Sequence, residues 1–368
     1  MRIPRADGLI HALLDPGHLA ECDEREWGEL VATARAANLL GALAARCRAE
    51  GVTPPQRPRR HLAGALQLAV RQRLSVRWEA QLLAERFAGL GRPVVLLKGA
   101  AYVLSPQPLA EGRMFGDIDI LVPRDALGEV EKRLMLGGWV GVKSDPYDQR
   151  YYREWMHELP PMMHIRRGTV VDVHHDIVPS TAGRATDPGG ILRRATPLPE
   201  LPALFVPSPE DLVVHSLTHL MHEGELHNGL RDLFDVHQLV GHFGAGGSFW
   251  ERVVRVAVDG AVAEPVAYGI HLVHAAFGTA VPQAVRVELG RAAKVPFWLE
   301  PIYRRALEPA GASRLSASAR LAQSVLFVRA HRLRMPWPLL VRHLAVKGVR
   351  AIKPEAARPR PAREMPAN

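Results

Sequence analysis

The sequence predicts a mixed α/β core between two helical regions, because the period of its apolar residues changes twice along the chain. Apolar residues recur at helical spacing before residue 91, whereas short β-branched and leucine runs bounded by glycine or proline follow it. Helical spacing then resumes. We expect four parts: an N-terminal helical region at 1–90, an α/β core at 91–205, a C-terminal helical domain at 206–352 and a basic, Pro-rich disordered tail at 353–368.

Two amphipathic stretches predict helices in the N-terminal region, one over Glu29–Leu40 and the other over Leu62–Leu90. The segment Thr53–Arg60 contains three prolines and is expected to break the chain between them. In the C-terminal region, Ser208-Pro-Glu-Asp-Leu has the residues of a helix start, and this helix is expected to run to about His222.

A second C-terminal helix is expected over Leu230–Phe243, and the later helical pattern should break at Met335-Pro-Trp-Pro.

The central part predicts a small sheet with flanking helices. Its strands are expected in Arg92–Gly99, at Asp117–Val122 and at Thr169–Ile177. A helix is expected over Arg124–Leu136, because Gly137-Gly138 follows it. Residues 179–209 are rich in Pro, Gly and Arg, so we expect a connection with little regular structure there.

The composition is that of a folded protein, with 47% apolar and 23% charged residues. Cys22 and Cys47 do not form a Cys-x-x-Cys pair, and alone they make neither a disulfide framework nor a thiolate zinc site. The first residues lack a secretory signal, and charges or prolines interrupt each apolar stretch before membrane-spanning length. We expect a cytoplasmic protein with no integral membrane association.

The net charge of +9 is concentrated at the C-terminal end, where residues 300–368 contain 14 Lys and Arg against 4 Asp and Glu. Such a stripe can attract phosphate backbones, anionic lipid or an acidic partner. A solvated helix face with a loose tail explains the same charge, and it is the commoner case.

Asp117 and Asp119 lie two residues apart in a predicted strand, so their side chains share one face. Two adjacent carboxylates repel each other unless a cation neutralises them, and hard oxygen ligands favour Mg²⁺, Mn²⁺ or Ca²⁺. Asp172 in the third strand completes a three-carboxylate cluster if that strand pairs near the second. Such a cluster can hold two metals for in-line nucleotidyl displacement, and Asp172 is also a candidate proton acceptor.

The run that ends in Lys98-Gly99 predicts a tight turn between a strand and a helix. Backbone N–H groups at a helix N-terminus favour negative charge, and Lys98 and Arg113 add cationic donors. Together these features suit a triphosphate.

The order of these motifs resembles that of a known family. It consists of Leu97-Lys-Gly-Ala-Ala, then Arg113-Met-Phe-Gly-Asp-Ile-Asp-Ile-Leu-Val122, then Val171-Asp-Val-His-His175. The order resembles bacterial nucleotidyltransferase-like proteins of the DNA polymerase β superfamily. It is most similar to a poorly characterised family with a Leu-Lys-Gly, Arg, Asp-x-Asp-Leu-Leu-Val and Asp-Leu-His pattern. More distantly, it is similar to the nucleotidyltransferase toxins of abortive-infection systems.

The resemblance covers about residues 90–240 and implies a polymerase β-like nucleotidyltransferase core that uses Mg²⁺ or Mn²⁺. It implies catalytic metal ligands at Asp117, Asp119 and Asp172. The nucleotide-binding residues it implies are Lys98, Gly99, Ala100, Arg113 and Gly116. One departure matters, because the superfamily commonly has Gly-Ser or Gly-Gly where this chain has Gly99-Ala100.

Several histidines are further candidates, since His215, His219 and His222 share one helix face and His227 is close in sequence. A zinc site is one interpretation, although the Glu of metalloprotease helices is absent. We favour packing against the core or lining of the substrate cleft. The candidate cleft residues are His174, His219, His222 and Arg231, with His157-Glu158 as a weaker pair.

Arg231, Asp232 and Asp235 are expected on one helix. Our default is that an Arg and Asp pair there fixes the helical domain to the core, with nucleotide contact as the minority interpretation.

The expected activity is transfer of a nucleoside monophosphate from a nucleoside triphosphate to an acceptor hydroxyl or phosphate, with release of pyrophosphate. One alternative is a nucleotide-binding or regulatory module that keeps the fold with altered catalysis. Another is a toxin that modifies RNA or tRNA ends. A small-molecule, peptide or protein acceptor is favoured over RNA, and the base preference and oligomeric state are not indicated.

Overall fold

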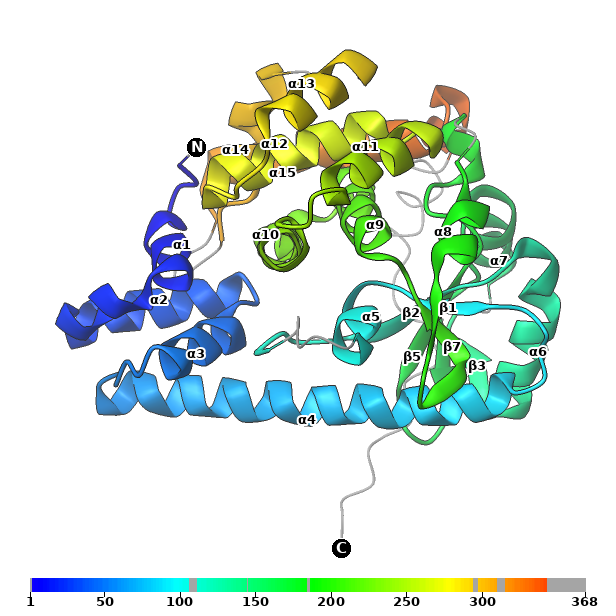
Figure 1. The fold of residues 1–368 in the computed structure, drawn as a ribbon, viewed down its shortest axis with the longest axis horizontal. Coiled ribbons are helices and arrows are strands. Elements are labelled where there is room, and N and C mark those ends of the chain that lie inside the picture. Colours follow the sequence, from blue (N-terminus) through cyan, green and yellow to red (C-terminus); the bar gives the residue numbers. More distant parts are fainter. Residues whose placement is uncertain are drawn as a thin grey trace, which may run out of the picture.

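A seven-stranded sheet with helices packed around it forms the centre of the protein, as the computed structural model shows. The structure describes residues 2–105, 111–143, 145–183, 186–293, 297–309 and 315–342. Helices precede and follow the sheet in the chain, so the predicted fold class is confirmed. In Figure 1 the N-terminal helices lie on the left, the sheet on the right, one long helix below both, and the C-terminal helices above.

The N-terminal helices are α1 (Asp7–Leu14), α2 (Glu24–Ala36), α3 (Leu40–Ala49) and α4 (Gln56–Phe87). Helix α2 begins earlier than expected, because Asp23 and Glu26 form a capping box that satisfies backbone N–H groups at its start. Helix α4 begins inside the expected break. Pro58 lies in its first turn, where a missing N–H costs no helical hydrogen bond.

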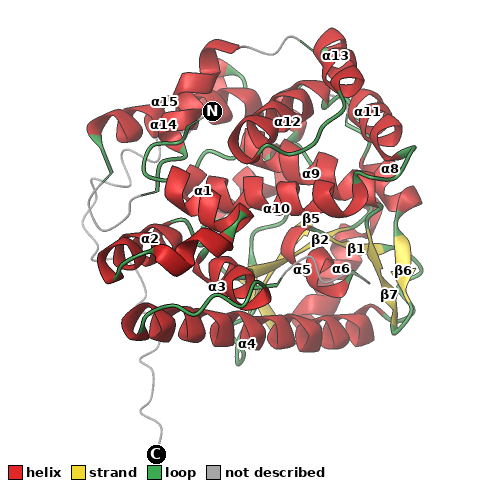
Figure 2. Ribbon diagram, turned by 60° about the vertical axis from the view of Figure 1, so that its left-hand side comes forward, coloured by secondary structure: helices red, strands yellow, loops and turns green. Residues whose placement is uncertain are grey.

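The sheet has the strand order β3-β4-β5-β2-β1-β7-β6. The strands are β1 (Val94–Leu96), β2 (Asp117–Leu121), β3 (Trp139–Gly141), β4 (Met162–His164), β5 (Val170–His174), β6 (Thr196–Leu198) and β7 (Leu201–Val206). Strands β2 and β5 run parallel, as do β1 and β7, and the other neighbours are antiparallel. Figure 2 shows helices above the strands and α4 passing beneath them, with β6 and β7 at the edge of the molecule.

The register of β2 and β5 determines where the polar side chains lie. Asp119 is opposite Asp172, and Leu121 is opposite His174. Ile118 and Ile120 are fully buried, so the apolar positions of β2 fix which way the strand faces. The predicted strands at 117–122 and 169–177 therefore exist and are direct neighbours.

The expectation that residues 179–209 have little regular structure was wrong. This segment contains α8 (Pro188–Arg194), β6 and β7, and β7 pairs with the central strand β1. The prolines that suggested a loop lie where no donor is needed, since Pro197 is on the edge strand β6 and Pro202 precedes the residues that pair with β1.

Between β1 and β4 lie α5 (Lys98–Leu104), α6 (Leu127–Leu136) and α7 (Pro146–Arg150). Helix α6 ends before Gly137-Gly138 as expected, and Gly138 adopts a φ of +96°, which favours glycine.

The C-terminal helices pack over the same side of the core. They are α9 (Pro209–His222), α10 (Gly229–Phe243), α11 (Phe249–Asp259), α12 (Ala263–Phe277), α13 (Gln283–Ala292), α14 (Glu300–Ala306) and α15 (Ala317–Arg334). Ser208 accepts a hydrogen bond from the backbone N–H of Asp211, which explains the start of α9. Helix α15 ends at the predicted break, and the expected tail lies outside the described residues.

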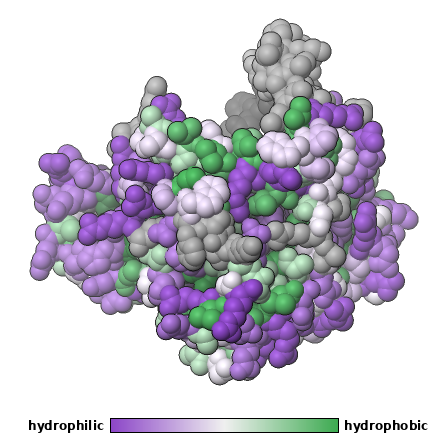
Figure 3. All heavy atoms as spheres, turned by 90° about the horizontal axis from the view of Figure 1, so that it is seen from above, coloured by the Kyte–Doolittle hydropathy of each residue, from purple (hydrophilic) through white to green (hydrophobic). Residues whose placement is uncertain are grey.

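Figure 3 shows the face above the C-terminal helices. Polar side chains gather at both ends of this face, and the apolar side chains drawn in colour form small areas between them. In the described part of the chain, no helix is both long and apolar enough to cross a lipid bilayer.

One ion pair joins α4 to the turn between β4 and β5. Arg167 donates from Nε and Nη2 to the two carboxylate oxygens of Glu79, at 2.6 and 3.0 Å, and Glu79 is 2% exposed. Thr169 donates to the same carboxylate at 2.8 Å, and the Arg167 guanidinium lies 4.8 Å from the ring centre of Trp139. The sheet is thereby held against the helix beneath it.

Substitution of Glu79 by Gln tests this contact. It removes the buried negative charge that neutralises Arg167, so we expect the free energy of unfolding to fall by about 3 kcal/mol. Urea denaturation measures the change. Asp125→Asn is the matched control, because its pair with Arg92 has both side chains more than half exposed and should contribute less than about 1 kcal/mol. Equal losses in the two variants would contradict the assigned role.

Candidate active site

A cleft of about 620 Å³ lies between the sheet and the C-terminal helices. Its walls come from β2, β5 and α5 of the core, the segment 151–158, and α9, α10 and α15 of the helical part. Tyr102 of α5 and Ser216 of α9 share a buried hydrogen bond of 2.6 Å, which closes one side of the cleft. Any ligand in it therefore contacts both halves of the protein.

Three carboxylates meet in this cleft. Asp117 and Asp119 come from β2, and Asp172 comes from β5 directly opposite Asp119. Asp119 is 4% exposed, Asp172 is half-buried and Asp117 is exposed at the end of its strand. The three predicted metal ligands are therefore close together on neighbouring parallel strands.

Two neighbouring side chains compensate the negative charge of Asp119. Lys98 Nζ lies 2.9 Å from its Oδ1, and His174 Nε2 lies 3.0 Å from the same atom. Burial disfavours the ionised form, but the charges and hydrogen bonds of Lys98 and His174 outweigh it and hold the pKa of Asp119 well below its usual value. Asp119 is therefore ionised at neutral pH.

The other two carboxylates lack such compensation. Burial, followed by the charges of Asp119 and Glu158, raises the pKa of Asp172 to about 7. The charge of Asp119, followed by burial, raises the pKa of Asp117. In the described structure Asp172 Oδ1 is buried without a hydrogen-bond partner. The positive charge around the cluster is thus too small to balance its carboxylates.

His174 lies between two carboxylates, with Nε2 on Asp119 and Nδ1 3.3 Å from Glu158 Oε2. Burial lowers the pKa of His174, but the hydrogen bond to Asp119 and the charge of Glu158 more than offset it, so the net shift is upward.

The turn after β1 brings Lys98 and Gly99 to the cleft. Lys98 begins α5 with a φ of +44°, in the left-handed region. A Cβ atom on Gly99 would lie 2.6 Å from Arg113 Nη1 and 2.7 Å from Phe115 Cδ1, so this position requires glycine. Ala100 is 1% exposed and does not line the cleft, so the structure does not bring this predicted nucleotide-binding residue to it.

Arg113 lines the cleft, but its charge is engaged. Its Nε donates to Asp235 Oδ2 of α10 at 2.7 Å, and its guanidinium lies 5.4 Å from the ring of Tyr102 and 5.1 Å from that of Phe115. An Arg and Asp pair does join the two parts of the protein, as our default interpretation expected. The arginine of this pair, however, is Arg113 of the core and not Arg231 of α10.

Arg231 instead donates to Asp232, the next residue of α10, at 2.7 Å, and both side chains face the cleft. Gly116, before β2, also lines it.

The helix histidines do not gather around one point. His219 and His222 line the cleft, where His219 lies 3.4 Å from Glu223 and His222 hydrogen-bonds to the carbonyl oxygen of Thr218 at 2.8 Å. His215 is buried behind the cleft wall, and His227 is exposed at the rim. These contacts do not favour the zinc interpretation.

Other cleft residues were missed by sequence reasoning. Tyr151 and Tyr152 line the wall beside His157 and Glu158, and Arg334 enters from the end of α15, 3.6 Å from Glu223. A local sequence pattern does not indicate contacts between segments that lie this far apart along the chain.

Comparison with known proteins identifies a family for this chain. A family model described as "Uncharacterised nucleotidyltransferase" matches residues 23–278. The chain belongs to this nucleotidyltransferase family. The match runs from α2 to the end of α12 and contains every carboxylate of the cluster, whereas Arg334 lies beyond it. No curated protein and no solved structure matched the chain. The family supports nucleoside monophosphate transfer as the general activity of this nucleotidyltransferase.

The stability of this nucleotidyltransferase should depend on the protonation of His215. Burial, with the charges of Lys98 and His174, lowers the pKa of His215 to about 3, against about 6.5 in an unfolded chain. The unfolded state therefore binds more protons below pH 6.5, and stability falls as pH decreases from 6.5 toward 3.

In His215→Gln this contribution is absent, so the slope of unfolding free energy against pH should be smaller by up to about 1.4 kcal/mol per pH unit. Urea denaturation between pH 7 and 5 measures it, with exposed His227→Gln as the control. Parallel slopes for His215→Gln and the unsubstituted protein would refute the assignment.

Proposed function

We propose that the protein transfers a nucleoside monophosphate from a nucleoside triphosphate to an acceptor hydroxyl or phosphate, with release of pyrophosphate, and that it needs Mg²⁺ or Mn²⁺. One observation carries this proposal. Asp117, Asp119 and Asp172 meet on neighbouring parallel strands at the cleft of a nucleotidyltransferase-family chain. A nucleotide-binding module without catalysis has no need for such a cluster.

The carboxylates fit a divalent metal of the magnesium class. All three offer hard oxygen donors, and Asp172 Oδ1 is buried without a partner among the described residues. Lys98 and His174 both contact Oδ1 of Asp119, which leaves Oδ2 for a cation. When bound, Mg²⁺ or Mn²⁺ would neutralise the cluster and stabilise the negative charge that develops on the triphosphate.

The residues around the cluster support the handling of phosphate. Lys98 and Gly99, at the start of α5, line the cleft beside the carboxylates, and the N-terminus of a helix favours negative charge. Arg231 on the opposite wall is a further cationic donor to the nucleotide or the acceptor. In this proposal the acceptor oxygen bonds to the α-phosphorus while the bond to the pyrophosphate oxygen breaks.

The proton of the acceptor hydroxyl needs a base. We assign this role to Asp172, because it lies in the cluster opposite Asp119 and its second oxygen is left to take a proton when Oδ1 binds the cation. Lys98 and His174 are positioned to keep Asp119 ionised throughout.

The cleft walls favour a small-molecule, peptide or protein acceptor over RNA. Glu158, Glu223 and Asp232 add carboxylates around the cluster, so the cleft lining is mixed in charge and is not the continuous basic surface that favours a phosphate backbone. The basic stretch that motivated the RNA interpretation is residues 300–368, of which 310–314 and 343–368 lie outside the described part of the chain.

Substitution of each clustered carboxylate by Asn should abolish transfer while leaving the protein folded. For Asp117→Asn and Asp119→Asn we expect a loss of at least about 10²–10³-fold in the rate of pyrophosphate release, because the cation that stabilises the developing charge loses a ligand. Incubation with each labelled triphosphate, Mg²⁺ and a cell lysate as acceptor source measures transfer. Exposed Asp125→Asn should keep full activity, and transfer that survives in Asp119→Asn would reject the mechanism.

Calorimetry separates an enzyme from a binding module. We expect a non-hydrolysable triphosphate to bind at least about tenfold more tightly with Mg²⁺ than without it, and Asp117→Asn to remove this difference. Metal-dependent binding by a protein that transfers nothing to any acceptor would favour the regulatory module. Equal affinity for the triphosphate with and without Mg²⁺ would count against both the enzyme and the regulatory-module interpretations of the cluster.

A further inference from the structure

We propose a second metal site in the cleft wall, formed by His157, Glu158 and His174, that takes a first-row transition-metal ion, with Zn²⁺ as the best fit. It differs in chemistry from the carboxylate cluster, because two of its three donors are imidazole nitrogens.

Backbone hydrogen bonds hold the three residues together. Residues 157–159 continue along the edge of β5 beyond β4, with Glu158 directly opposite His174. The N–H of His175 donates to the His157 carbonyl oxygen at 2.8 Å, and the N–H of Leu159 donates to that of Val173 at 2.8 Å. The sheet therefore places Glu158 beside His174, and the backbone bond from His175 holds His157 next to them.

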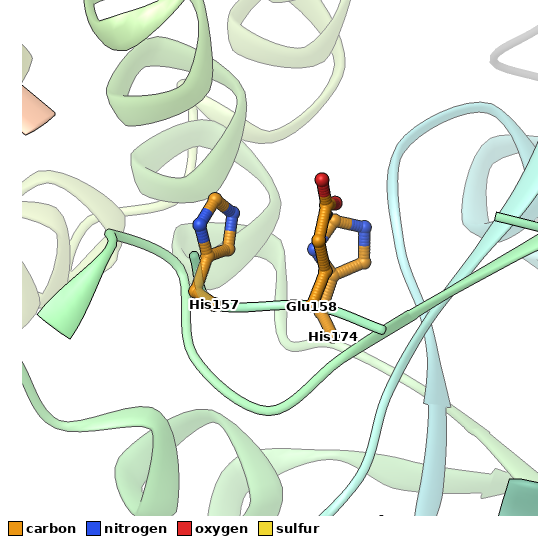
Figure 4. Close-up of side chains that lie close together, drawn as sticks. All are labelled: His157, Glu158 and His174. Carbon is orange, nitrogen blue, oxygen red and sulfur yellow. Dashed lines mark ion pairs between the residues drawn. The ribbon is translucent and has the colours of Figure 1, made fainter. Parts of the chain in front are cut away.

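The donor atoms already face a common point. One ligand atom from each residue lies within 4.8 Å of the other two, and Glu158 Oε2 is 3.3 Å from His174 Nδ1. The rings of His157 and His174 have centres 5.3 Å apart, and Figure 4 shows them beside the Glu158 carboxylate. An ion with bonds near 2.1 Å requires neighbouring donors about 3 Å apart, so small side-chain rotations suffice.

A second observation independently points to a ligand. His157 Nδ1 is buried and has no hydrogen-bond partner among the described residues. Buried ring nitrogens are ordinarily hydrogen-bonded or bound to a metal. Figure 4 draws Nδ1 on the side of the ring away from Glu158 and His174 and Nε2 on the near side, so the ion would bind Nε2 or, after a half-turn of the ring, Nδ1.

The donor set selects the class of metal. Two imidazoles and one carboxylate are typical ligands of Zn²⁺ and related ions, whereas Mg²⁺ prefers oxygen alone. His174 would bind through Nδ1 and release the proton on that atom to solvent. Its Nε2–H would still donate to Asp119 at 3.0 Å, an outer carboxylate contact that fixes the ring of a metal-binding histidine.

The experiment titrates chelator-treated full-length protein with Zn²⁺ alone by calorimetry and with Co²⁺ alone by visible absorption, without nucleotide. We expect one ion to bind at this site. His157→Ala and Glu158→Gln should each weaken its binding by about 100-fold or more and remove the Co²⁺ bands that arise from nitrogen ligation.

Two controls locate the ion. His227→Ala removes an exposed histidine of the same cleft and should bind Zn²⁺ like the unsubstituted protein. Asp117→Asn should retain Zn²⁺ binding, since that carboxylate belongs to the other cluster. Circular dichroism checks that each variant is folded, and the backbone hydrogen bonds at 157–159 do not require the His157 ring. If His157→Ala does not fold, Glu158→Gln decides.

No Zn²⁺ binding by the unsubstituted protein, or equal affinity in His157→Ala and Glu158→Gln, would overturn the proposal. Loss of binding in Asp117→Asn alone would assign the ion to the carboxylate cluster and overturn it as well. Because no nucleotide is present, failure of nucleotidyl transfer leaves this result unchanged, and the reverse also holds.

Discussion

The arrangement of the cleft depends on one constraint. The register of β2 and β5 places carboxylates side by side, where they repel each other. Asp119 and Asp172 are direct partners on parallel strands, and the apolar residues between the acidic positions of β2 allow no shift of register. The side chains of Lys98 and His174 converge on one oxygen of Asp119. The fold therefore compensates one carboxylate internally and leaves the other two to a cation.

The helical part completes this arrangement rather than merely covering it. The pair of Arg113 and Asp235 and the hydrogen bond between Tyr102 and Ser216 join α10 and α9 to the core at the edge of the cleft. Both contacts are largely buried, so their geometry is shielded from competing water. The cleft thus has a defined shape because its two walls are joined by specific polar contacts.

Local signals predicted the strands at Asp117 and Asp172, the fold class and the helix that begins after Ser208, because each has its own apolar period or capping residue. The strand at Leu201–Val206 was missed because a segment with several prolines has the same composition in a loop as in a hairpin at the edge of a sheet. The partner of Arg113, the approach of Arg334 and the placing of His157 depend on tertiary contacts. The boundaries of the predicted domains and the roles assigned to the cleft residues stay predictions.

The backbone at Lys98 shows how stability and chemistry compete at this position. A lysine with a φ of +44° costs about 1–3 kcal/mol relative to relaxed backbone, and glycine would adopt the same conformation with almost no strain. Glycine at this position would also remove the ammonium group that contacts the buried Asp119, and an uncompensated buried charge costs about 3–5 kcal/mol. The strain at Lys98 is therefore the smaller of two costs, and the turn holds a charge where a relaxed backbone would leave a buried carboxylate without its partner.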